Sequence, residues 1–187
     1  MFKPFELSLL LVVPKDFKVE LRNRTLDFQF LGQFEIERDE QKNPITFQNN
    51  YLLGVRTDLT KSGKPELITI LPNSLRLKLG RKYYDTRNLA DVWQLPGIYA
   101  FVSMGGRNEV KTRYIGRASR AVIHRLRRYL APGSLESTDN VVNRLIFESL
   151  DQGKKVLLYF YPEKDTEKRL QALLHPDWNR EVPKVKE

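Results

Sequence analysis

The sequence predicts an α+β fold, in which a β-rich N-terminal region precedes a region of mixed strands and helices. Short segments that alternate apolar and polar residues recur through residues 1–90. A Gly-Gly pair between two apolar segments predicts a hairpin within residues 98–115. Apolar residues at helical spacing then predict helices between residues 120 and 174. We therefore expect two regions, 1–90 and 91–187.

The N-terminal region is predicted to form a small antiparallel sheet or barrel. Turn residues such as Arg22-Asn23 separate its alternating segments. The apolar run at residues 7–13 is too short to span a membrane, so we interpret it as a buried strand and expect no membrane partner. We find no catalytic motif here, and the region could support the rest of the chain, contact DNA or mediate dimerisation. The alternating segments are 19–21, 26–31, 34–37, 45–47 and 67–70.

Charge and composition favour a polyanionic partner. Lys plus Arg number 32 against 23 Asp plus Glu, which gives a net charge of +9 and a pI near 9.7. Such an excess is typical of proteins that bind nucleic acid. The chain has no Cys, which excludes a disulfide partner and thiol catalysis and is consistent with a cytoplasmic location. With only His124 and His175, a histidine-rich metal site is excluded as well.

Residues 76–94 form a basic connector between the two regions. Its Lys and Arg residues outnumber its aspartates, and Tyr83 and Tyr84 lie among them. Cations interleaved with aromatic rings suit phosphate contact and stacking on bases or sugars. A solvated linker explains the same composition at least as well.

Residues 98–115 are predicted to form a hairpin that carries two tyrosines. Residues 98–102 form one predicted strand and residues 110–115 its return, with Gly105-Gly106 in the turn. Tyr99 and Tyr114 would then stand on paired strands near one end of a sheet. We expect Gly116 to end the second strand, because glycine allows the backbone to turn tightly.

An arginine-rich amphipathic helix is predicted over residues 120–130. Val122, Leu126 and Leu130 form its apolar stripe. At about 100° per residue, Arg125 and Tyr129 lie together at one edge of that stripe. Residues 110–135 contain no acidic residue that could neutralise the cations, so we expect the cations to contact DNA phosphates. The cations of this segment are Lys111, Arg113, Arg117, Arg120, Arg125, Arg127 and Arg128.

A second helix is predicted to begin at Thr138 or Asp139, either of which could cap it, and to end at Leu150. Residues 156–161 follow and are the most strand-like run in this half of the chain. We expect them to form a central strand of the sheet. The residues of the helix that should face inward are Val142, Leu145, Ile146 and Ser149.

The last predicted helix opens at Pro162 or Asp165. Its informative residue is Glu167, which falls on the apolar stripe, where an unpaired charge would be costly. The partner of this carboxylate could be an arginine or a divalent cation, since hard cations prefer oxygen ligands. Glu163, four residues earlier, is the second candidate for the same role. The apolar residues of the stripe are Leu170, Leu173 and Leu174, after which the segment 176–179 should stop the helix.

Five features follow one another along the chain: Gly97-Ile98-Tyr99, Tyr114-Ile115-Gly116, Arg125 with Tyr129, Glu167, and Asn179 at the end of Pro176-Asp177-Trp178-Asn179. In this order they resemble the GIY-YIG nuclease family. The two tyrosines are wider apart than is usual in that family, which implies an extended hairpin loop. The arginine also falls slightly later in its helix than in compact members, so Arg127 and Arg128 remain alternatives to Arg125. The resemblance covers residues 97–179 and not the N-terminal region.

The resemblance implies that residues 91–187 form a catalytic domain, a small three-stranded antiparallel sheet flanked by helices, that hydrolyses phosphodiester bonds. Tyr99 would be the general base or would orient the attacking water. A free tyrosine has a pKa of about 10, so it needs nearby positive charge to act as a base. Arg125 would contact the scissile phosphate, and Glu167 would hold one Mg²⁺ or Mn²⁺ ion per active site.

By the same resemblance, Tyr114 and Tyr129 would position water, phosphate or Arg125 through hydrogen bonds. Asn179 would tie the end of the last helix back to the site. These assignments make the site a joint product of the hairpin and the C-terminal helices.

The order of the regions resembles the type II restriction endonucleases of the family, because the β-rich region precedes the nuclease module. In those enzymes N-terminal segments surround double-stranded DNA, and two subunits cut a palindromic site. We therefore expect a site-specific endonuclease that acts as a homodimer. A phage or mobile-element nuclease of loose specificity is one alternative, and a DNA-binding protein on a nuclease scaffold is another.

Overall fold

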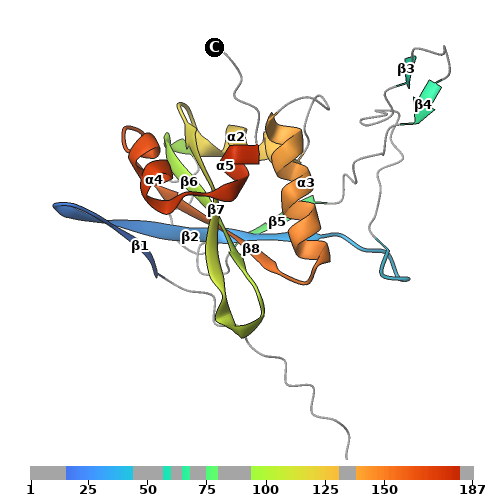
Figure 1. The fold of residues 1–187 in the computed structure, drawn as a ribbon, viewed down its shortest axis with the longest axis horizontal. Coiled ribbons are helices and arrows are strands. Elements are labelled where there is room, and N and C mark those ends of the chain that lie inside the picture. Colours follow the sequence, from blue (N-terminus) through green and yellow to red (C-terminus); the bar gives the residue numbers. More distant parts are fainter. Residues whose placement is uncertain are drawn as a thin grey trace, which may run out of the picture.

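The computed structural model describes residues 16–43, 57–59, 65–67, 75–79, 94–130 and 138–181. These residues form an α+β fold, with helices packed against a curled sheet whose described pairings are all antiparallel (Figure 1). Several predictions lie outside the described residues: the strand at 7–13, the segment 45–47, most of the basic connector and the expected boundary near residue 90.

The main sheet has six strands rather than the three predicted. They are β1 (Asp16–Leu21), β2 (Arg24–Ile36), β5 (Leu75–Leu79), β6 (Gly97–Met104), β7 (Val110–Ala118) and β8 (Lys155–Tyr161). Their order is β1-β2-β8-β6-β7, with β5 also paired to β2. The predicted sheet had too few strands because β2 pairs with β8, so that strands from the N-terminal half extend the sheet of the C-terminal half. β8 lies between β2 and β6, which confirms the predicted central strand.

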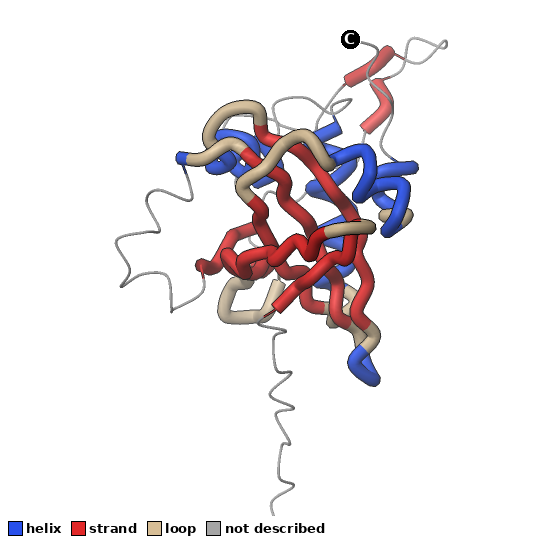
Figure 2. The backbone as a smooth tube through the Cα atoms, turned by 90° about the vertical axis from the view of Figure 1, so that its left-hand side faces the viewer, coloured by secondary structure: helices blue, strands red, loops and turns tan. Residues whose placement is uncertain are grey.

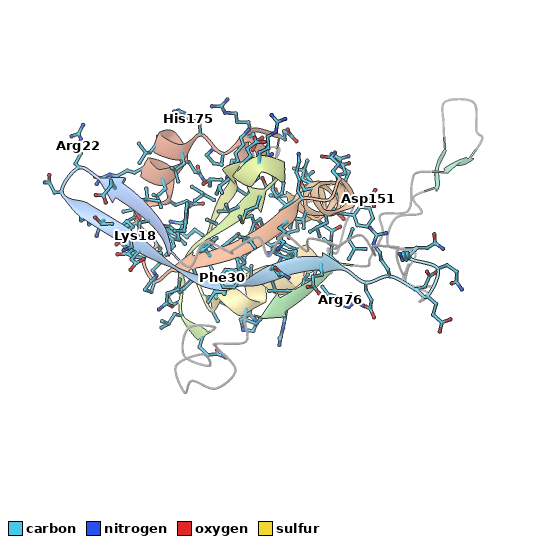
Figure 3. All side chains as sticks on the ribbon, turned by 90° about the horizontal axis from the view of Figure 1, so that it is seen from below. Lys18, Arg22, Phe30, Arg76, Asp151 and His175 are labelled. Atoms are coloured by element: carbon cyan, nitrogen blue, oxygen red, sulfur yellow. The ribbon has the colours of Figure 1, made fainter. Side chains whose placement is uncertain are left out.

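The β1–β2 hairpin confirms the turn predicted at Arg22-Asn23. Residues 26–31 and 34–37, predicted as separate strands, instead belong largely to the single long strand β2, with an irregularity between Phe30 and Gly32. Figure 3 shows Arg22 at the outer end of this hairpin. A separate two-stranded sheet is formed by β3 (Thr57–Leu59) and β4 (Pro65–Leu67).

The described residues form four α-helices: α2 (Val122–Leu130), α3 (Thr138–Asp151), α4 (Glu167–Leu174) and α5 (Asp177–Glu181). The prediction for α3 is confirmed within one residue. By contrast, α4 begins at Glu167, later than either predicted start. The segment expected to stop the chain's last helix instead forms α5. His175, with φ 46° and ψ 52°, adopts the left-handed conformation that commonly ends a helix, and this residue separates α4 from α5.

Side chains alternate between the two faces of the sheet, and each face has its own apolar core. Tyr99 and Phe101 of β6 belong to the core that includes residues of α2 and α3. Ile98 and Ala100 belong to the other core, where Leu170 of α4 packs. The curl of the sheet between these helices is visible in Figure 2. The helices α2 and α4, which carry predicted site residues, therefore pack against different faces of the sheet.

Helix faces agree with the predictions only in part. Leu170 of α4 is buried, but Leu173 is 49% exposed, so the predicted stripe is wrong at that position. Leu170 and Leu174, one helical turn apart, pack against the second apolar core, and Leu173 lies to the side of their row. In α3 all four residues predicted to face inward are buried: Val142, Leu145, Ile146 and Ser149.

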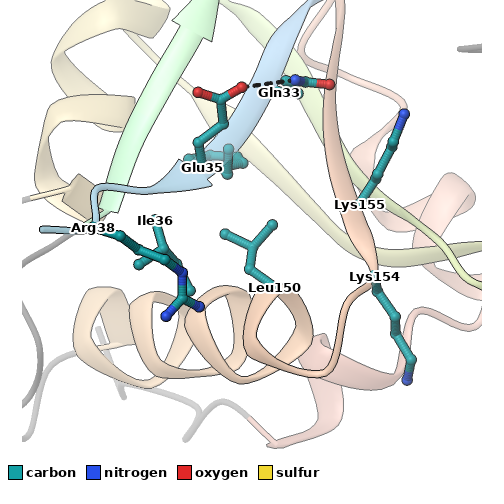
Figure 4. Close-up of a pocket in the computed structure, with 8 residues that line it drawn as sticks. Gln33, Glu35, Ile36, Arg38, Leu150, Lys154 and Lys155 are labelled. Carbon is teal, nitrogen blue, oxygen red and sulfur yellow. Dashed lines mark hydrogen bonds between the residues drawn. The ribbon is translucent and has the colours of Figure 1, made fainter. Parts of the chain in front are cut away.

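A cavity of about 330 Å³ opens between β2, α3 and β8 (Figure 4). Lys155, on its wall, pairs with Met104 at the end of β6 opposite Tyr99. None of the predicted catalytic residues lines the cavity, which is therefore separate from the candidate site. Its lining residues are Gln33, Phe34, Glu35, Ile36, Arg38, Leu150, Lys154 and Lys155.

Candidate active site

Three tyrosine hydroxyls converge between the sheet and α2. Tyr99 stands on β6, Tyr114 on β7 and Tyr129 in α2. The hydroxyl oxygens of Tyr99 and Tyr129 are 2.6 Å apart, and the Tyr129 hydroxyl donates to that of Tyr114 at 3.3 Å. All three side chains are buried, with at most 6% of any of them exposed. We call these residues the tyrosine cluster; residues distant in the sequence are brought together in it.

Gly116 makes room for this cluster and does not end a strand. It lies inside β7, paired with Tyr99, so the predicted turn is wrong. A Cβ atom at this position would overlap the ring and hydroxyl of Tyr99. Gly97 is needed in the same way, because a Cβ there would overlap the Phe160 ring and the Tyr161 carbonyl oxygen. Both glycines of the two tripeptides therefore permit close packing in a sheet.

Arg125 is the arginine that contacts the tyrosine cluster. Its Nε donates to the Tyr99 hydroxyl at 3.3 Å, and its guanidinium carbon lies 5.0 Å from the centroid of the Tyr129 ring. Its Nη1 lies 2.9 Å from Oδ1 of Asp139, an ion pair without an aligned hydrogen bond. The side chain is 24% exposed. Among the three candidate arginines of α2, only Arg125 has described contacts with these tyrosines.

Glu167 opens α4 with a carboxylate that is 22% exposed. Gln171 donates to its Oε1 at 3.3 Å, and Arg117 Nε lies 3.6 Å from its Oε2. Burial raises the pKa of Glu167, although Arg117, Lys168 and Arg125 act in the opposite direction. The charge of Arg125 is the smallest of these effects on the pKa of Glu167. An arginine was expected as the alternative to a metal ion beside Glu167. Arg117 is that arginine, and its distance of 3.6 Å from the carboxylate is longer than in a close ion pair.

Glu163 does not share the position of Glu167. It lies before α4, and its Oε1 accepts a hydrogen bond from Arg24 of β2 at 2.7 Å. The contact joins the outer end of the β1–β2 hairpin to the loop that leads into α4. The second candidate for a metal carboxylate therefore has a different partner.

Asn179 binds the backbone of the edge strand β7, at the centre of the second tripeptide. Its Oδ1 accepts from the N–H of Ile115 and its Nδ2 donates to the carbonyl of Ile115, each at 2.8 Å. Gln171 adds a third hydrogen bond, to the same carbonyl, at 3.1 Å. Edge-strand backbone groups need such partners. Asn179 thus ties α5 to the hairpin, as the resemblance implied.

The expectation that nothing neutralises the basic segment is wrong, because acids from later helices pair with it. Asp177 of α5 accepts from Lys111 at 3.0 Å and from Arg113 at 2.6 Å. Burial acts to raise the pKa of Asp177, but these two hydrogen bonds lower it overall. Arg128 pairs with Asp139 at 2.9 Å. Apart from Arg125, six cations of this segment were expected to contact DNA. Of these six, Arg120 and Arg127 are exposed and have no acidic partner in the described part of the chain.

Burial favours the protonated form of two members of the tyrosine cluster, Tyr99 and Tyr129. Burial raises the pKa of Tyr99 well above its usual value, and the nearby Arg125 only partly offsets this effect. Burial likewise raises the pKa of Tyr129. Neutral hydroxyls can donate and accept hydrogen bonds, whereas a general base must lose its proton. Of the two roles expected for Tyr99, the direction of its pKa favours positioning over proton abstraction.

The described residues offer one carboxylate, that of Glu167, as a ligand for the expected Mg²⁺ or Mn²⁺ ion. Among the described residues no group of three or more His, Asp or Glu side chains gathers. Glu167 can supply one oxygen ligand, and Mg²⁺ commonly keeps several waters while taking the rest from a phosphate. Gln171 would orient the carboxylate from the side, as outer partners of metal ligands do.

Sequence reasoning missed three residues that hold the site together. Asp139 was considered only as a helix cap, Asp177 only as part of a helix stop, and Gln171 not at all. The spacing of Gln171 four residues after Glu167 was a usable signal, since such residues are neighbours on a helix. Nothing in the sequence pairs Asp139 with α2 or Asp177 with β7.

Comparison with known proteins finds no matching family model, no matching curated protein and no matching solved structure. The described helices are all too short or too polar to cross a membrane.

Proposed function

We propose that the protein is a metal-dependent endonuclease that hydrolyses phosphodiester bonds in double-stranded DNA. The observation that carries this proposal is the placement of Arg125. Its guanidinium contacts the Tyr99 hydroxyl and the Tyr129 ring, and its positive charge acts to lower the pKa of Glu167. A cation held by a row of hydroxyls, with a half-buried carboxylate that responds to its charge, is an arrangement suited to a phosphate.

Arg125 would bind the scissile phosphate. Its Nε is used by Tyr99 and its Nη1 by Asp139, while its Nη2 has no partner among the described residues. A phosphate oxygen can occupy that remaining donor. Because the guanidinium is already fixed, little reorganisation would be needed when negative charge develops on the phosphate.

The tyrosine cluster would hold Arg125 and the attacking water in place. The hydroxyls of Tyr99, Tyr129 and Tyr114 form a continuous chain that begins at Arg125. Such a chain fixes the orientation of each member, because every hydroxyl has a neighbour to donate to or accept from. A divalent cation on Glu167 would polarise the phosphate and make a bound water more acidic.

The proposed class is a site-specific type II restriction endonuclease that acts in the cytoplasm as a homodimer on a palindromic site. Support comes from the N-terminal strands, which continue the sheet and present Lys18 and Arg22, both exposed, beside the nuclease module. A phage or mobile-element nuclease of loose specificity would use the same site. Sequencing the ends of digested DNA separates the two, since discrete ends indicate restriction and random ends indicate loose specificity.

Plasmid cleavage with Mg²⁺ tests the proposal. We expect the wild type to cut, and Arg125→Ala and Glu167→Ala to lose about 100–1,000-fold in rate, the range seen when a charge-stabilising group is removed. Tyr99→Phe should lose less, because it keeps the packing and removes one hydroxyl. Glu148→Ala is the matched control, since Glu148 is an exposed carboxylate on α3 that pairs only with Arg144.

Two outcomes would contradict the assignment. Full activity in Glu167→Ala would exclude that residue as the metal ligand. Retained DNA binding by the wild type, without cleavage in Mg²⁺ or Mn²⁺, would favour a DNA-binding protein on a nuclease scaffold.

A further inference from the structure

The structure assigns Asp139 as the residue that positions Arg125, an inference that rests on the proposed function. Asp139 lies in the first turn of α3, and its side chain is only 4% exposed. Its Oδ1 is 2.9 Å from Arg125 Nη1 and its Oδ2 is 2.9 Å from Arg128 Nε. A buried carboxylate is strongly destabilising unless it is paired, so these two arginines are what this carboxylate requires.

The two arginines differ in what the pairing can do for them. Arg128 is 64% exposed, and an ion pair at such a position contributes little. Arg125 is held on three sides: by Asp139, by the Tyr99 hydroxyl and by the face of the Tyr129 ring. Removing the carboxylate would free the Nη1 side and let the guanidinium rotate. Asp139 therefore determines which donor of Arg125 remains for a phosphate.

The helix that carries Asp139 is itself fixed against α2. Asn143, one turn later, donates to the backbone carbonyl of Tyr129 at 2.6 Å. Val142 and Ile146 of the same helix are fully buried. A site residue held by a rigid element keeps its geometry better than one held by a loop. The Asp139 carboxylate is thus held in place and can fix the position of the Arg125 guanidinium.

A purely structural role predicts different behaviour. If Asp139 only joined α3 to α2, its loss would reduce stability and the amount of folded enzyme, but the folded enzyme would turn over normally. If it positions Arg125, its loss lowers kcat, since misplacing a reacting group by about 1 Å can cost about 100-fold in rate. Binding of DNA would change little, because an acidic group is removed and the cations stay.

The test is steady-state cleavage of plasmid DNA with Mg²⁺ by the full chain carrying Asp139→Asn, Arg125→Ala or both. We expect Asp139→Asn to lower kcat by about 100-fold with an unchanged KM. The double variant should be no slower than Arg125→Ala, because the two residues act as a unit. Asp151→Asn, at the other end of α3, is the matched control and should keep the wild-type kcat.

An undiminished kcat in Asp139→Asn, in an enzyme whose wild type cuts DNA, overturns this inference and leaves the proposed function intact. A wild type that does not cut overturns both. If Asp139→Asn fails to fold, the ¹⁵N spectrum of the wild-type arginine side chains decides. Hindered rotation of the Arg125 guanidinium supports the inference, and rotation as free as that of Arg127 overturns it.

Discussion

The two walls of the candidate site are built in opposite ways. The tyrosine cluster consists of short-range contacts between buried rings, none more than 6% exposed. The second group, which we call the carboxylate arm, consists of Glu167, Gln171 and Arg117. These side chains are long, and Glu167 and Arg117 are 22% and 50% exposed. The contacts within the arm, at 3.3 Å and 3.6 Å, are looser.

The difference teaches which part of the chemistry each wall can serve. Closely packed rings have one arrangement, so whatever they hold is held in a fixed place. That suits an arginine that must meet developing charge without reorganising. Longer side chains at the surface can adjust, which suits a ligand set completed by water and substrate. The rigid wall should therefore be sensitive to added volume, and the adjustable wall to changes of charge.

Adding one methyl group to the rigid wall should give the largest effect. Gly116→Ala places a Cβ against the ring and hydroxyl of Tyr99, which cannot move away because Tyr129 lies behind it. We expect a loss of about 3 kcal/mol in the free energy of unfolding, the upper end for overpacking. Denaturant unfolding measures it.

The control for this substitution is Gly106→Ala. Gly106 has no atom within 4 Å of an added Cβ, so its free energy of unfolding should change by about 0.5 kcal/mol or less. Equal stability of the two alanine variants would mean that the tyrosine cluster adjusts easily, and the contrast between the walls would be lost.

Breaking the joint between the hairpin and α5 should have the next largest effect. Asn179→Ala removes two hydrogen bonds to Ile115, and at about 1 kcal/mol for each the free energy of unfolding should fall by about 2 kcal/mol. Asn179→Asp keeps the acceptor for the Ile115 N–H but sets a carboxylate oxygen against the Ile115 carbonyl oxygen, so it should lose at least as much as Asn179→Ala. Urea unfolding of the two variants gives the comparison. An Asp variant as stable as the wild type would show that the hydrogen bond to the Ile115 carbonyl contributes nothing.

Most of the C-terminal fold could be predicted from the sequence because its signals are local. The apolar run of residues 98–102 and the apolar stripe of α3 depend only on neighbours along the chain. The extension of the sheet could not be predicted in this way. It depends on β2 pairing with β8, two segments more than a hundred residues apart, and no short pattern records which strand is a partner.

The candidate site shows the same limit at the level of single residues. The tyrosines, Arg125, Glu167 and Asn179 were named from tripeptides and spacing. The structure joins the tyrosines and Arg125 through hydrogen bonds, and it ties Asn179 to Ile115 of β7. Their supporting acids were missed because ion pairs such as those of Asp139 and Asp177 join separate elements. Gly116 was expected to end a strand, whereas it makes room for Tyr99. That close approach becomes evident only when the two strands pair.

The smallest expected effect is on the pH dependence of stability, and it comes from Glu167 of the carboxylate arm. Burial raises the pKa of Glu167 above its ordinary value of 4.5, so the folded protein binds this proton more readily than the unfolded chain. Stability associated with Glu167 is therefore present at low pH and is lost as the pH rises through the raised pKa. Glu167→Gln removes the titration, and at neutral pH the variant should be more stable than the wild type, by about 0.5 kcal/mol or less.

Thermal unfolding at several pH values measures this difference, which should shrink as the pH falls toward 4.5, while the same variant loses cleavage. Glu148→Gln, an exposed carboxylate on α3, is the control for a change of charge alone. A Glu167→Gln protein that is less stable than the wild type at neutral pH would contradict this prediction. The contact with Arg117 would then outweigh burial, and Glu167 would be one half of a structural ion pair. The predicted sign instead describes a carboxylate that the fold holds at a small cost in stability, as is common for groups at functional sites.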